Sequence, residues 1–361
     1  MLSIVLGTRP EIIKMSPIIR ACQNEDVEFS LLHTGQHYSY EMDRIFFDEL
    51  RLPQPEYHLD VGSCTHAEQT GKIMAGIEKI YLYDTPAIAL VQGDTNTVLA
   101  GALAASKLHV NVGHVEAGLR SFDRQMPEEI NRVVADHISD FLFAPTENAK
   151  KHLLNEGISD NKIYVTGNTV VDAVYQNREI AKKNSTILST MKLQDREYFL
   201  VTTHRSENVD MKNRLSGILS ALSRLHDIYN LPVIFPIHPR TQKMMKEFGL
   251  DARGITITPP IGYLDFLELE ANARLILTDS GGLQEESCIL KVPCVTLREN
   301  TERPETIDVG ANVLVGTDVD QIISTVGEMG KSGRNWENPY GDGDASKRIV
   351  QICTEKLIPN K

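Results

Sequence analysis

The chain begins MLSIVLGTRPEIIKMSPIIRAC (residues 1–22), and this stretch indicates an α/β fold. A short apolar run ends at Gly7, and apolar side chains then recur at helical spacing over residues 10–22. A buried strand that leads into an amphipathic helix is the repeating unit of a parallel sheet covered by helices. We therefore predict a first strand at residues 3–7 and a helix at residues 10–22.

The same alternation of short apolar runs and amphipathic stretches occurs twice along the chain. The two series are separated by an increasingly charged helical connector, roughly residues 169–192. The predicted strands are residues 3–7, 29–33, 87–92, 111–115, 141–144 and 163–166, then 199–202, 233–236, 255–258, 275–278, 294–297 and 313–315. We expect two Rossmann-like domains that face one another across a cleft, with ligands at the carboxyl ends of the strands.

Length and composition exclude several classes of protein. The 361 residues suggest about two domains. No apolar run approaches the roughly 20 residues that span a bilayer, and the N-terminus lacks the order of a signal peptide. Five scattered cysteines without a CxxC pair argue against a disulfide framework and a structural zinc site. The net charge of −12 disfavours nucleic acid and anionic membranes as partners. We expect a cytoplasmic protein.

Charged side chains follow most of the predicted strands. Helix capping is the alternative for single members of this set, such as Asp94 or Ser280, but capping does not require His, Arg and Glu together. The segments concerned are GTRPE (7–11), QGDT (92–95), HVEAG (114–118), HRSE (204–207), HPR (238–240), DSGG (279–282), and Arg298 with RPE (303–305). Two polar sheet edges of this kind predict an active site between the domains.

The segment DSGG (279–282) predicts an anion site. Gly281 and Gly282 would expose backbone N–H groups at the start of a helix, which binds phosphate readily. Arg9, Lys14 and Arg303 are the cations that could complement a diphosphate; for Lys14 the alternative is a solvated helix face. No Walker loop and no GxGxxG after the first strand are present. We therefore expect no nicotinamide cofactor.

Asp94, Glu116, Glu128 and His204 form the predicted catalytic set. Converging carboxylates repel one another and, when buried, have raised pKa values, which suits proton transfer. For Glu128 and Glu129 the alternative is that they are ordinary acids in the first turn of a helix entered at Pro127, and we favour that reading for Glu129. Neither HExxH nor EF-hand spacing occurs, so no metal is expected.

Glu286, one helical turn after the glycine pair, could accept both hydroxyls of a ribose. A favourable position at the positive end of the helix is the other explanation. Taken in order, all these segments resemble the non-hydrolysing UDP-N-acetylglucosamine 2-epimerases over essentially the whole chain. The matching segments are GTRPEIIKMSP (7–17), QGDTNT (92–97), GHVEAGLRS (113–121), PEEINRVVADH (127–137), GNTVVDA (167–173), TDSGGLQEE (278–286), TERPE (301–305) and NPYGDGDAS (338–346).

The resemblance implies conversion of UDP-GlcNAc to UDP-ManNAc without a cofactor, by elimination of UDP and its re-addition, in a homodimer. It implies the fold of two-domain nucleotide-sugar glycosyltransferases (GT-B), with domains at 1–169 plus a returning helix in 344–361, and at 170–343. The family's catalytic residues fall on Asp94, Glu116, Glu128 and His204, and its ligand contacts on Arg9, Lys14, Phe266, Ser280, Gly281, Gly282, Glu286 and Arg303. Without the resemblance, Phe266 would be assigned to the core.

The chain departs from the family in three places, one of which is Ile261, where the family has a Gln contact just before Phe266. It has HRSE (204–207) where many bacterial members have HRRE, and Gln36-His37 is followed by YSY (38–40). In bacterial relatives this neighbourhood contributes to a second, activating UDP-GlcNAc site, so the resemblance does not extend to that regulation. The competing functions are a GT-B glycosyltransferase, a hydrolysing epimerase and, from another class, a noncatalytic nucleotide-sugar sensor.

Overall fold

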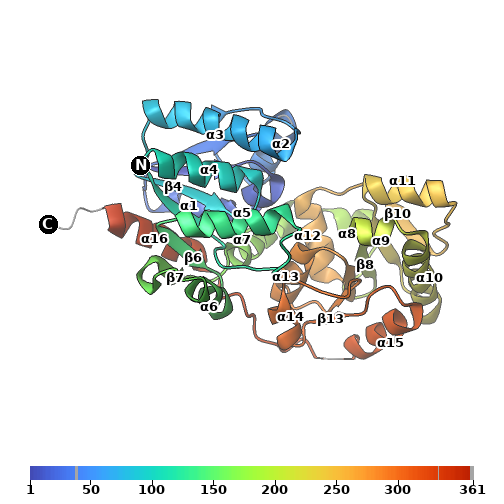
Figure 1. The fold of residues 1–361 in the computed structure, drawn as a ribbon. Helices are drawn as coiled ribbons and strands as arrows, with labels where there is room; N and C mark the ends of the chain where they lie inside the picture. Colours follow the sequence, from blue (N-terminus) through green and yellow to red (C-terminus); the bar gives the residue numbers. More distant parts are fainter. Residues whose placement is uncertain (37–39, 332, 358–361) are drawn as a thin grey trace. The chain divides into compact units, whose positions relative to one another are not determined.

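The structure, a computed structural model, describes residues 1–36, 40–331 and 333–357 (Figure 1). The chain folds into two compact units. The first unit contains Met1–Gln176 and the chain from Tyr340 onward, and the second contains Asn177–Pro339. The changeover falls within helix α7 (Thr169–Asn184). Within the described ranges, no helix is both long and apolar enough to cross a membrane.

The first unit is a seven-stranded sheet in the order β3-β2-β1-β4-β5-β6-β7, with every pair parallel. The strands are β1 (Leu2–Leu6), β2 (Phe29–His33), β3 (Tyr57–His58), β4 (Ile88–Gln92), β5 (Asn111–Val115), β6 (Phe141–Ala144) and β7 (Ile163–Val165). The six predicted strands of this half are confirmed to within a residue or so at their ends. Strand β3 was not predicted, because two residues are too few to show a hydrophobic period.

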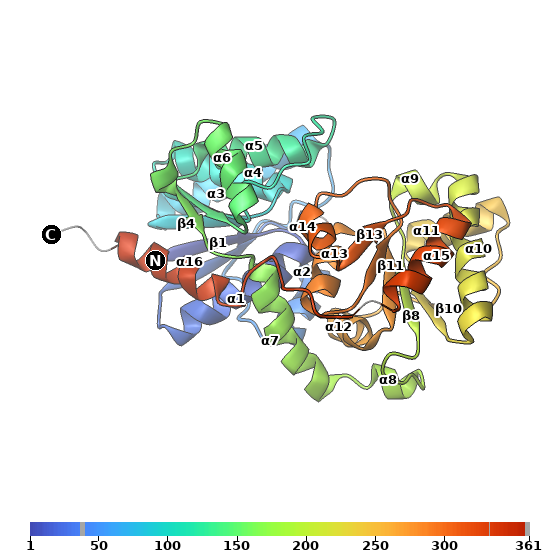
Figure 2. The same cartoon turned by 90° about the horizontal axis from the view of Figure 1, so that it is seen from below.

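The helices of the first unit cover this sheet. They are α1 (Arg9–Asn24), α2 (Tyr40–Glu49), α3 (His66–Tyr83), α4 (Asn96–Lys107), α5 (Pro127–Ile138), α6 (Glu147–Asn155), the 3-10 turn η1 (Asp160–Lys162), the first half of α7, and α16 (Ala345–Leu357). Helix α16 packs against α1 (Figure 2) and buries Ile349, Val350 and Cys353. Its start is tied to α7, since the Ser346 hydroxyl donates to Asp172 (2.6 Å).

Close packing of α4 on the sheet follows from small side chains. Its alanines at positions 100, 102, 104 and 105 are almost fully buried. A methyl group on Gly101 would lie 3.1 Å from Val91 of β4. In β5, a methyl group on Gly113 would lie 2.6 Å from a Leu90 methyl and 3.1 Å from the Phe143 ring. Gly101 is therefore favoured by the short distance between helix and sheet, and Gly113 by the side chains of the two neighbouring strands.

The second unit is a six-stranded parallel sheet in the order β10-β9-β8-β11-β12-β13. Its strands are β8 (Phe199–Thr202), β9 (Val233–Pro236), β10 (Ile255–Thr258), β11 (Leu275–Thr278), β12 (Cys294–Thr296) and β13 (Asn312–Leu314). Its helices are α8 (Ile187–Thr190), α9 (Ser206–Val209), α10 (Lys212–Tyr229), α11 (Pro239–Phe248), α12 (Tyr263–Asn272), α13 (Gly281–Ile289), α14 (Pro304–Asp308) and α15 (Val319–Met329). All six predicted strands are confirmed.

Both sheets have a topological switch point, where the strand order reverses. In the first unit it lies between β1 and β4, and in the second between β8 and β11. In open α/β sheets, ligands bind beyond the carboxyl ends of the strands at this point. The loops that leave these four strands carry Arg9, Asp94, His204 and Ser280. The fold thus places candidate residues from the sequence at the expected edge of each unit.

Candidate active site

Asp94 follows β4, and its side chain is held by a cation. The carboxylate is ion-paired with Arg132 of α5, and the Asp94 backbone oxygen accepts a hydrogen bond from the Asn131 amide (2.9 Å). The N-cap of α4 is Thr95, whose hydroxyl accepts from Val98 N (3.3 Å). The alternative that Asp94 is a helix cap is therefore wrong, and its carboxylate is available at the sheet edge.

Glu116 follows β5 and meets Lys14 of α1. Both carboxylate oxygens lie 2.8 Å from the Lys14 ammonium, and one also accepts from the Gln92 amide. These donors favour the charged carboxylate. Lys14 is 15% exposed, so the alternative of a solvated helix face is wrong. Glu116 also has a positive φ of 71°, a conformation that costs a non-glycine residue about 1 kcal/mol or more and that clusters at functional sites.

Glu128 and Glu129 have different environments in the first turn of α5, which begins at Pro127 as predicted. Glu128 is exposed. Glu129 is buried and accepts from the backbone N–H groups of Ser121 (2.9 Å) and Phe122 (3.1 Å) and from Arg132 (3.0 Å). Burial favours its neutral form, but these donors keep the pKa of Glu129 below its usual value. The interpretation of Glu129 as an ordinary first-turn acid is wrong, because it anchors the preceding loop.

Glu11 is a buried acid that the sequence analysis did not single out. Its carboxylate accepts from the backbone N–H groups of Gly7 (2.6 Å) and Thr8 (2.8 Å) and from the Thr95 hydroxyl. Burial raises the pKa of Glu11 to about 7, although these hydrogen bonds oppose the shift. The signal in the sequence was the capping box TRPE (8–11). Glu11 links the turn after β1 to the residue that follows Asp94.

Arg9, the other predicted cation of α1, is exposed at the first position of that helix. Its guanidinium carbon lies 5.6 Å from the centre of the Phe46 ring, a distance at which a cation is attracted to the ring face. The first unit therefore brings Lys14, Glu116 and Asp94 to one sheet edge, with Arg9 on the same helix as Lys14.

In the second unit, α13 begins with the predicted glycine pair. Ser280 is its N-cap residue and makes no side-chain capping bond, so the capping explanation for its hydroxyl is wrong. A methyl group added to Gly281 or Gly282 would meet no atom closer than 3.8 Å. Protein packing does not require these glycines, and the space leaves the N–H groups of the helix start accessible to an anion.

His204 is connected to this helix start through Asp279. The His204 Nδ1 lies 3.2 Å from the Asp279 carboxylate, which is fully buried. That carboxylate also accepts from the Thr203 hydroxyl (2.6 Å), the Arg205 backbone N–H (3.0 Å) and the Asn208 amide (3.1 Å). Burial opposes ionisation, but these bonds, led by the one to His204, lower the pKa of Asp279 to about 2. The His204 side chain is 41% exposed and is thus oriented without being buried.

Two acids meet where ribose recognition was predicted. Glu270 of α12 is fully buried, and neither oxygen accepts a hydrogen bond from a described donor. Burial, and then the charge of and hydrogen bond to Glu286, raise the pKa of Glu270 well above its usual range. A neutral Glu270 avoids a second buried negative charge beside Glu286. Phe266, on the same helix, is partly exposed rather than in the core.

Arg303, the third predicted cation, precedes α14 and is anchored to α13. Its Nε lies 2.9 Å from the carboxylate of Glu285, which is fully buried. Helix α13 therefore carries the glycine pair and Glu286 and also positions Arg303. The second unit brings these groups together around one helix, with His204 attached through Asp279.

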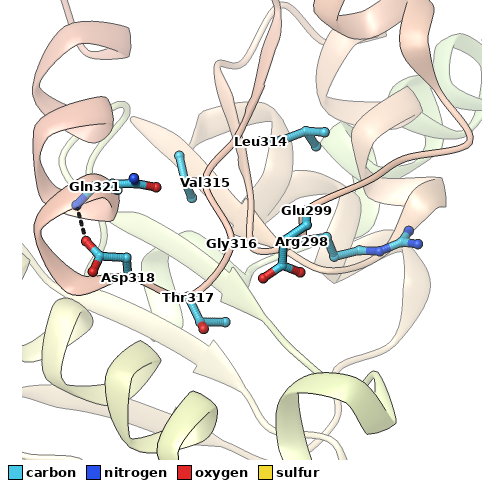
Figure 3. A pocket seen from close by; sticks show the side chains of 8 residues that line it. All are labelled: Arg298, Glu299, Leu314, Val315, Gly316, Thr317, Asp318 and Gln321. Atoms are coloured by element: carbon cyan, nitrogen blue, oxygen red, sulfur yellow. Dashed lines mark hydrogen bonds between the residues drawn. The ribbon is translucent and has the colours of Figure 1, made fainter.

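A separate cavity of about 570 Å³ lies beside the loops after β12 and β13. Its lining residues are Arg298, Glu299, Leu314, Val315, Gly316, Thr317, Asp318 and Gln321 (Figure 3). Asp318 caps α15, since it accepts from the Gln321 backbone N–H (2.9 Å), and Arg298 is paired with Glu302 (3.0 Å). Arg298 and Asp318 thus have partners within the protein, and the lining contains none of the predicted catalytic residues.

Among the residues that the structure describes, no group of three His, Cys, Asp or Glu side chains could hold a metal ion. All five cysteines are free thiols. Residues 37–39, in the neighbourhood where bacterial relatives differ, lie outside the described residues.

Comparison with known proteins gives consistent results. The family model described as UDP-N-acetylglucosamine 2-epimerase matches residues 20–354. A UDP-N-acetylglucosamine 2-epimerase of Methanocaldococcus jannaschii is 59% identical over 360 residues, covering 98% of each chain. A UDP-2,3-diacetamido-2,3-dideoxy-D-glucuronate 2-epimerase of Pseudomonas aeruginosa is 41% identical, covering 97% of this chain and 98% of the relative.

Comparison with solved structures points to the same family as the sequence matches. The crystal structure of the M. jannaschii UDP-GlcNAc 2-epimerase in complex with UDP-GlcNAc and UDP has a TM-score of 0.89 at 58% identity, covering 98% of this chain and 99% of that one. A glycosyltransferase from Rickettsia africae has a TM-score of 0.59 at 13% identity, covering 100% and 99%, which shows a shared two-domain GT-B-like fold. The sheet orders, the ordered motifs and these matches lead to one conclusion: the chain belongs to the UDP-N-acetylglucosamine 2-epimerase family.

Proposed function

We propose that this protein is a non-hydrolysing epimerase that interconverts UDP-GlcNAc and UDP-ManNAc. The observation that carries the proposal is one edge of the first sheet. There Asp94 follows β4, and Glu116, which is paired with Lys14 of α1, follows the neighbouring strand β5. Acids held by cations beside a switch point suit proton transfer next to a leaving diphosphate. The M. jannaschii relative, crystallised with UDP-GlcNAc and UDP, supports the choice of substrate.

The chemistry explains why several acids are needed. The hydrogen at C2 of the sugar is not next to a carbonyl, so its direct removal is difficult. In an elimination, a carboxylate takes the C2 proton, the C1–C2 double bond forms, and UDP leaves C1 with the electrons of the C1–O bond. In the return step, a proton reaches the opposite face of C2 and UDP re-forms the bond to C1. Asp94, Glu116 and Glu128 are the proposed proton carriers for the two faces.

We assign binding of UDP mainly to the second unit. The start of α13, with Ser280, Gly281 and Gly282, is proposed to hold the diphosphate, and Glu286 the ribose hydroxyls. Phe266, Arg9, Lys14 and Arg303 are proposed as further contacts. His204, oriented by Asp279, stabilises the leaving diphosphate or supports proton transfer in this scheme.

These assignments require the two halves of the chain to act on one substrate. The proposed domains are 1–169 with 344–361 and 170–343, and they close over the bound sugar nucleotide. Small-angle scattering with and without UDP tests this: an unchanged radius of gyration would contradict closure. A homodimer is proposed by family likeness, and light scattering measures it.

Incubation with UDP-GlcNAc alone in deuterium oxide, followed by NMR, tests the reaction. The proposal predicts UDP-ManNAc and UDP-GlcNAc that carry deuterium at C2. Release of free ManNAc and UDP as the net product would indicate a hydrolysing epimerase, and unlabelled sugar would indicate a transferase. The same assay with UDP-2,3-diacetamido-2,3-dideoxy-D-glucuronate tests the substrate for which the P. aeruginosa relative is named.

Variants test the assigned residues. Asp94→Asn and Glu116→Gln remove one proton carrier each while keeping shape, and each should lower kcat by about 100-fold or more. Glu78→Gln is the matched control, because Glu78 is exposed on α3, and it should leave kcat unchanged. His204→Ala should also lower kcat, and a retained rate would remove His204 from the mechanism.

A further inference from the structure

His114, in the middle of the first sheet, makes two hydrogen bonds that no proton-transfer role requires. The residue is fully buried in β5. Its Nδ1 lies 2.6 Å from the Asp136 carboxylate, and its Nε2 lies 2.8 Å from the backbone oxygen of Gly93. A carbonyl oxygen can only accept, so Nε2 must carry a hydrogen.

Asp136 is held in its charged form. Its second oxygen accepts from Arg120 (2.7 Å) and from the Gly118 backbone N–H (3.1 Å). Although burial opposes ionisation, His114 and Arg120 keep the pKa of Asp136 below its usual value. An ionised Asp136 cannot donate to Nδ1, so that nitrogen must carry a hydrogen as well.

The charges around His114 are balanced by these neighbours. Arg120 repels a positive imidazole but is itself paired with Glu156, the C-cap residue of α6, through its Nε and one terminal nitrogen (2.7 Å each). Burial lowers the pKa of His114, whereas Asp136 and the Gly93 oxygen raise it, and the net direction is upward. Because the Gly93 oxygen and the ionised Asp136 each require a hydrogen on the nitrogen that faces them, the ring is a positively charged imidazolium.

The positive charge of His114 is connected to the candidate site through Gly93. Gly93 has a positive φ of 85° and directly precedes Asp94. His114 fixes the carbonyl on one side of Asp94, and Asn131 of α5 fixes the Asp94 carbonyl on the other side. Asp136, also on α5, in addition holds the N–H of Gly118, two residues after Glu116. One buried ion pair thus connects both acid-bearing turns to a single helix.

We propose that His114 is a positioning residue of the reaction: a doubly protonated imidazolium that, with Asp136, fixes the Asp94 turn against helix α5. The inference rests on the proposed role of Asp94 in proton transfer. A displacement of a catalytic group by about 1 Å can cost about 100-fold in rate. Loss of the tether, meaning the His114–Asp136 pair and its hydrogen bond to the Gly93 oxygen, should therefore lower kcat more than it weakens substrate binding.

Nitrogen NMR of the full chain, with ¹⁵N-labelled histidine, tests the charge directly. The signals of His114 are assigned in the unaltered chain, by correlating the ring with the backbone amide of the same residue. Both ring nitrogens should carry a hydrogen from about pH 6 to about pH 8, the range where an ordinary histidine loses one. A ring nitrogen without hydrogen at about pH 7 would overturn the proposal. This measurement is independent of catalysis, so its failure is distinct from a failure of the proposed function.

Two variants that both remove the charge test the tether. In His114→Gln the amide can still reach the Gly93 oxygen, whereas in His114→Asn the shorter amide reaches Asp136 only. His114→Asn should lower kcat about 10-fold or more below His114→Gln, with KM within about threefold in both. Equal kcat values, or a loss confined to KM, would overturn the positioning role. If neither variant folds, the NMR result on the unaltered chain decides.

Discussion

Replacing Glu11 by Gln should change how the stability of the first unit depends on pH. Burial raises the pKa of this carboxyl from 4.5 to about 7 in the folded protein. Between these values the folded chain keeps a proton that the unfolded chain releases, so the free energy of unfolding falls as pH rises. One pH unit corresponds to about 1.4 kcal/mol. The loss therefore amounts to about 3 kcal/mol between about pH 4.5 and about pH 7.

The Glu11→Gln variant does not lose this free energy of unfolding as pH rises, because an amide does not ionise. Its oxygen can accept the N–H groups of Gly7 and Thr8, which both point at one oxygen of Glu11, and the amide is nearly the shape of a neutral carboxyl. The variant should match the unaltered protein near pH 4.5 and exceed its free energy of unfolding by up to about 3 kcal/mol near pH 8.

Urea unfolding followed by circular dichroism at a series of pH values measures this difference. Carboxylates with lowered pKa values, such as Asp279, contribute equally to the pH dependence of both proteins. Their contributions therefore cancel when the two free energies of unfolding are subtracted. Glu78→Gln, an exposed substitution on α3, serves as the control and should give a curve parallel to that of the unaltered protein. A difference between Glu11→Gln and the unaltered protein that stays constant from about pH 5 to about pH 8 would refute the reasoning.

Three further outcomes follow from the structure. Gly113→Ala forces a methyl group to 2.6 Å from a neighbouring leucine and should cost about 1–3 kcal/mol of stability in urea unfolding; Gly71→Ala, in open space on α3, should be neutral or stabilising. The ionised Asp279 contributes about 2 kcal/mol of stability above pH 3.8, and this contribution is lost as pH falls toward about 2. Asp279→Asn should remove it, so acid unfolding of this variant should depend less on pH than that of the unaltered protein. Glu270→Gln keeps a donor toward Glu286 and should hold the calorimetric Kd for UDP within about threefold, whereas Glu270→Ala should weaken it about tenfold; equal Kd values would contradict a proton shared by the two acids.

The order of elements could be predicted from local sequence alone. Short apolar runs and helical spacing located twelve of the strands to within a residue or so, because burial on both faces of a parallel strand leaves an uninterrupted apolar signal. The helix start at Pro127 was equally readable, since it depends on neighbouring residues only. Residue types at strand ends also indicated the site, because parallel strands present their carboxyl ends at one edge.

The partners of the charged side chains were decided only by the tertiary structure. Lys14 and Glu116 are 102 positions apart, and nothing local distinguishes this pair from two solvated side chains. Glu129 and Glu11 read as ordinary acids at helix starts, yet both are buried, and their burial depends on chain segments that pack over them. His114 shows the same limit: its charge arises because the register of β4 against β5 places the Gly93 oxygen, and α5 places Asp136, at its two nitrogens. Protonation states depend on distances between remote segments, and only the packed fold sets those distances.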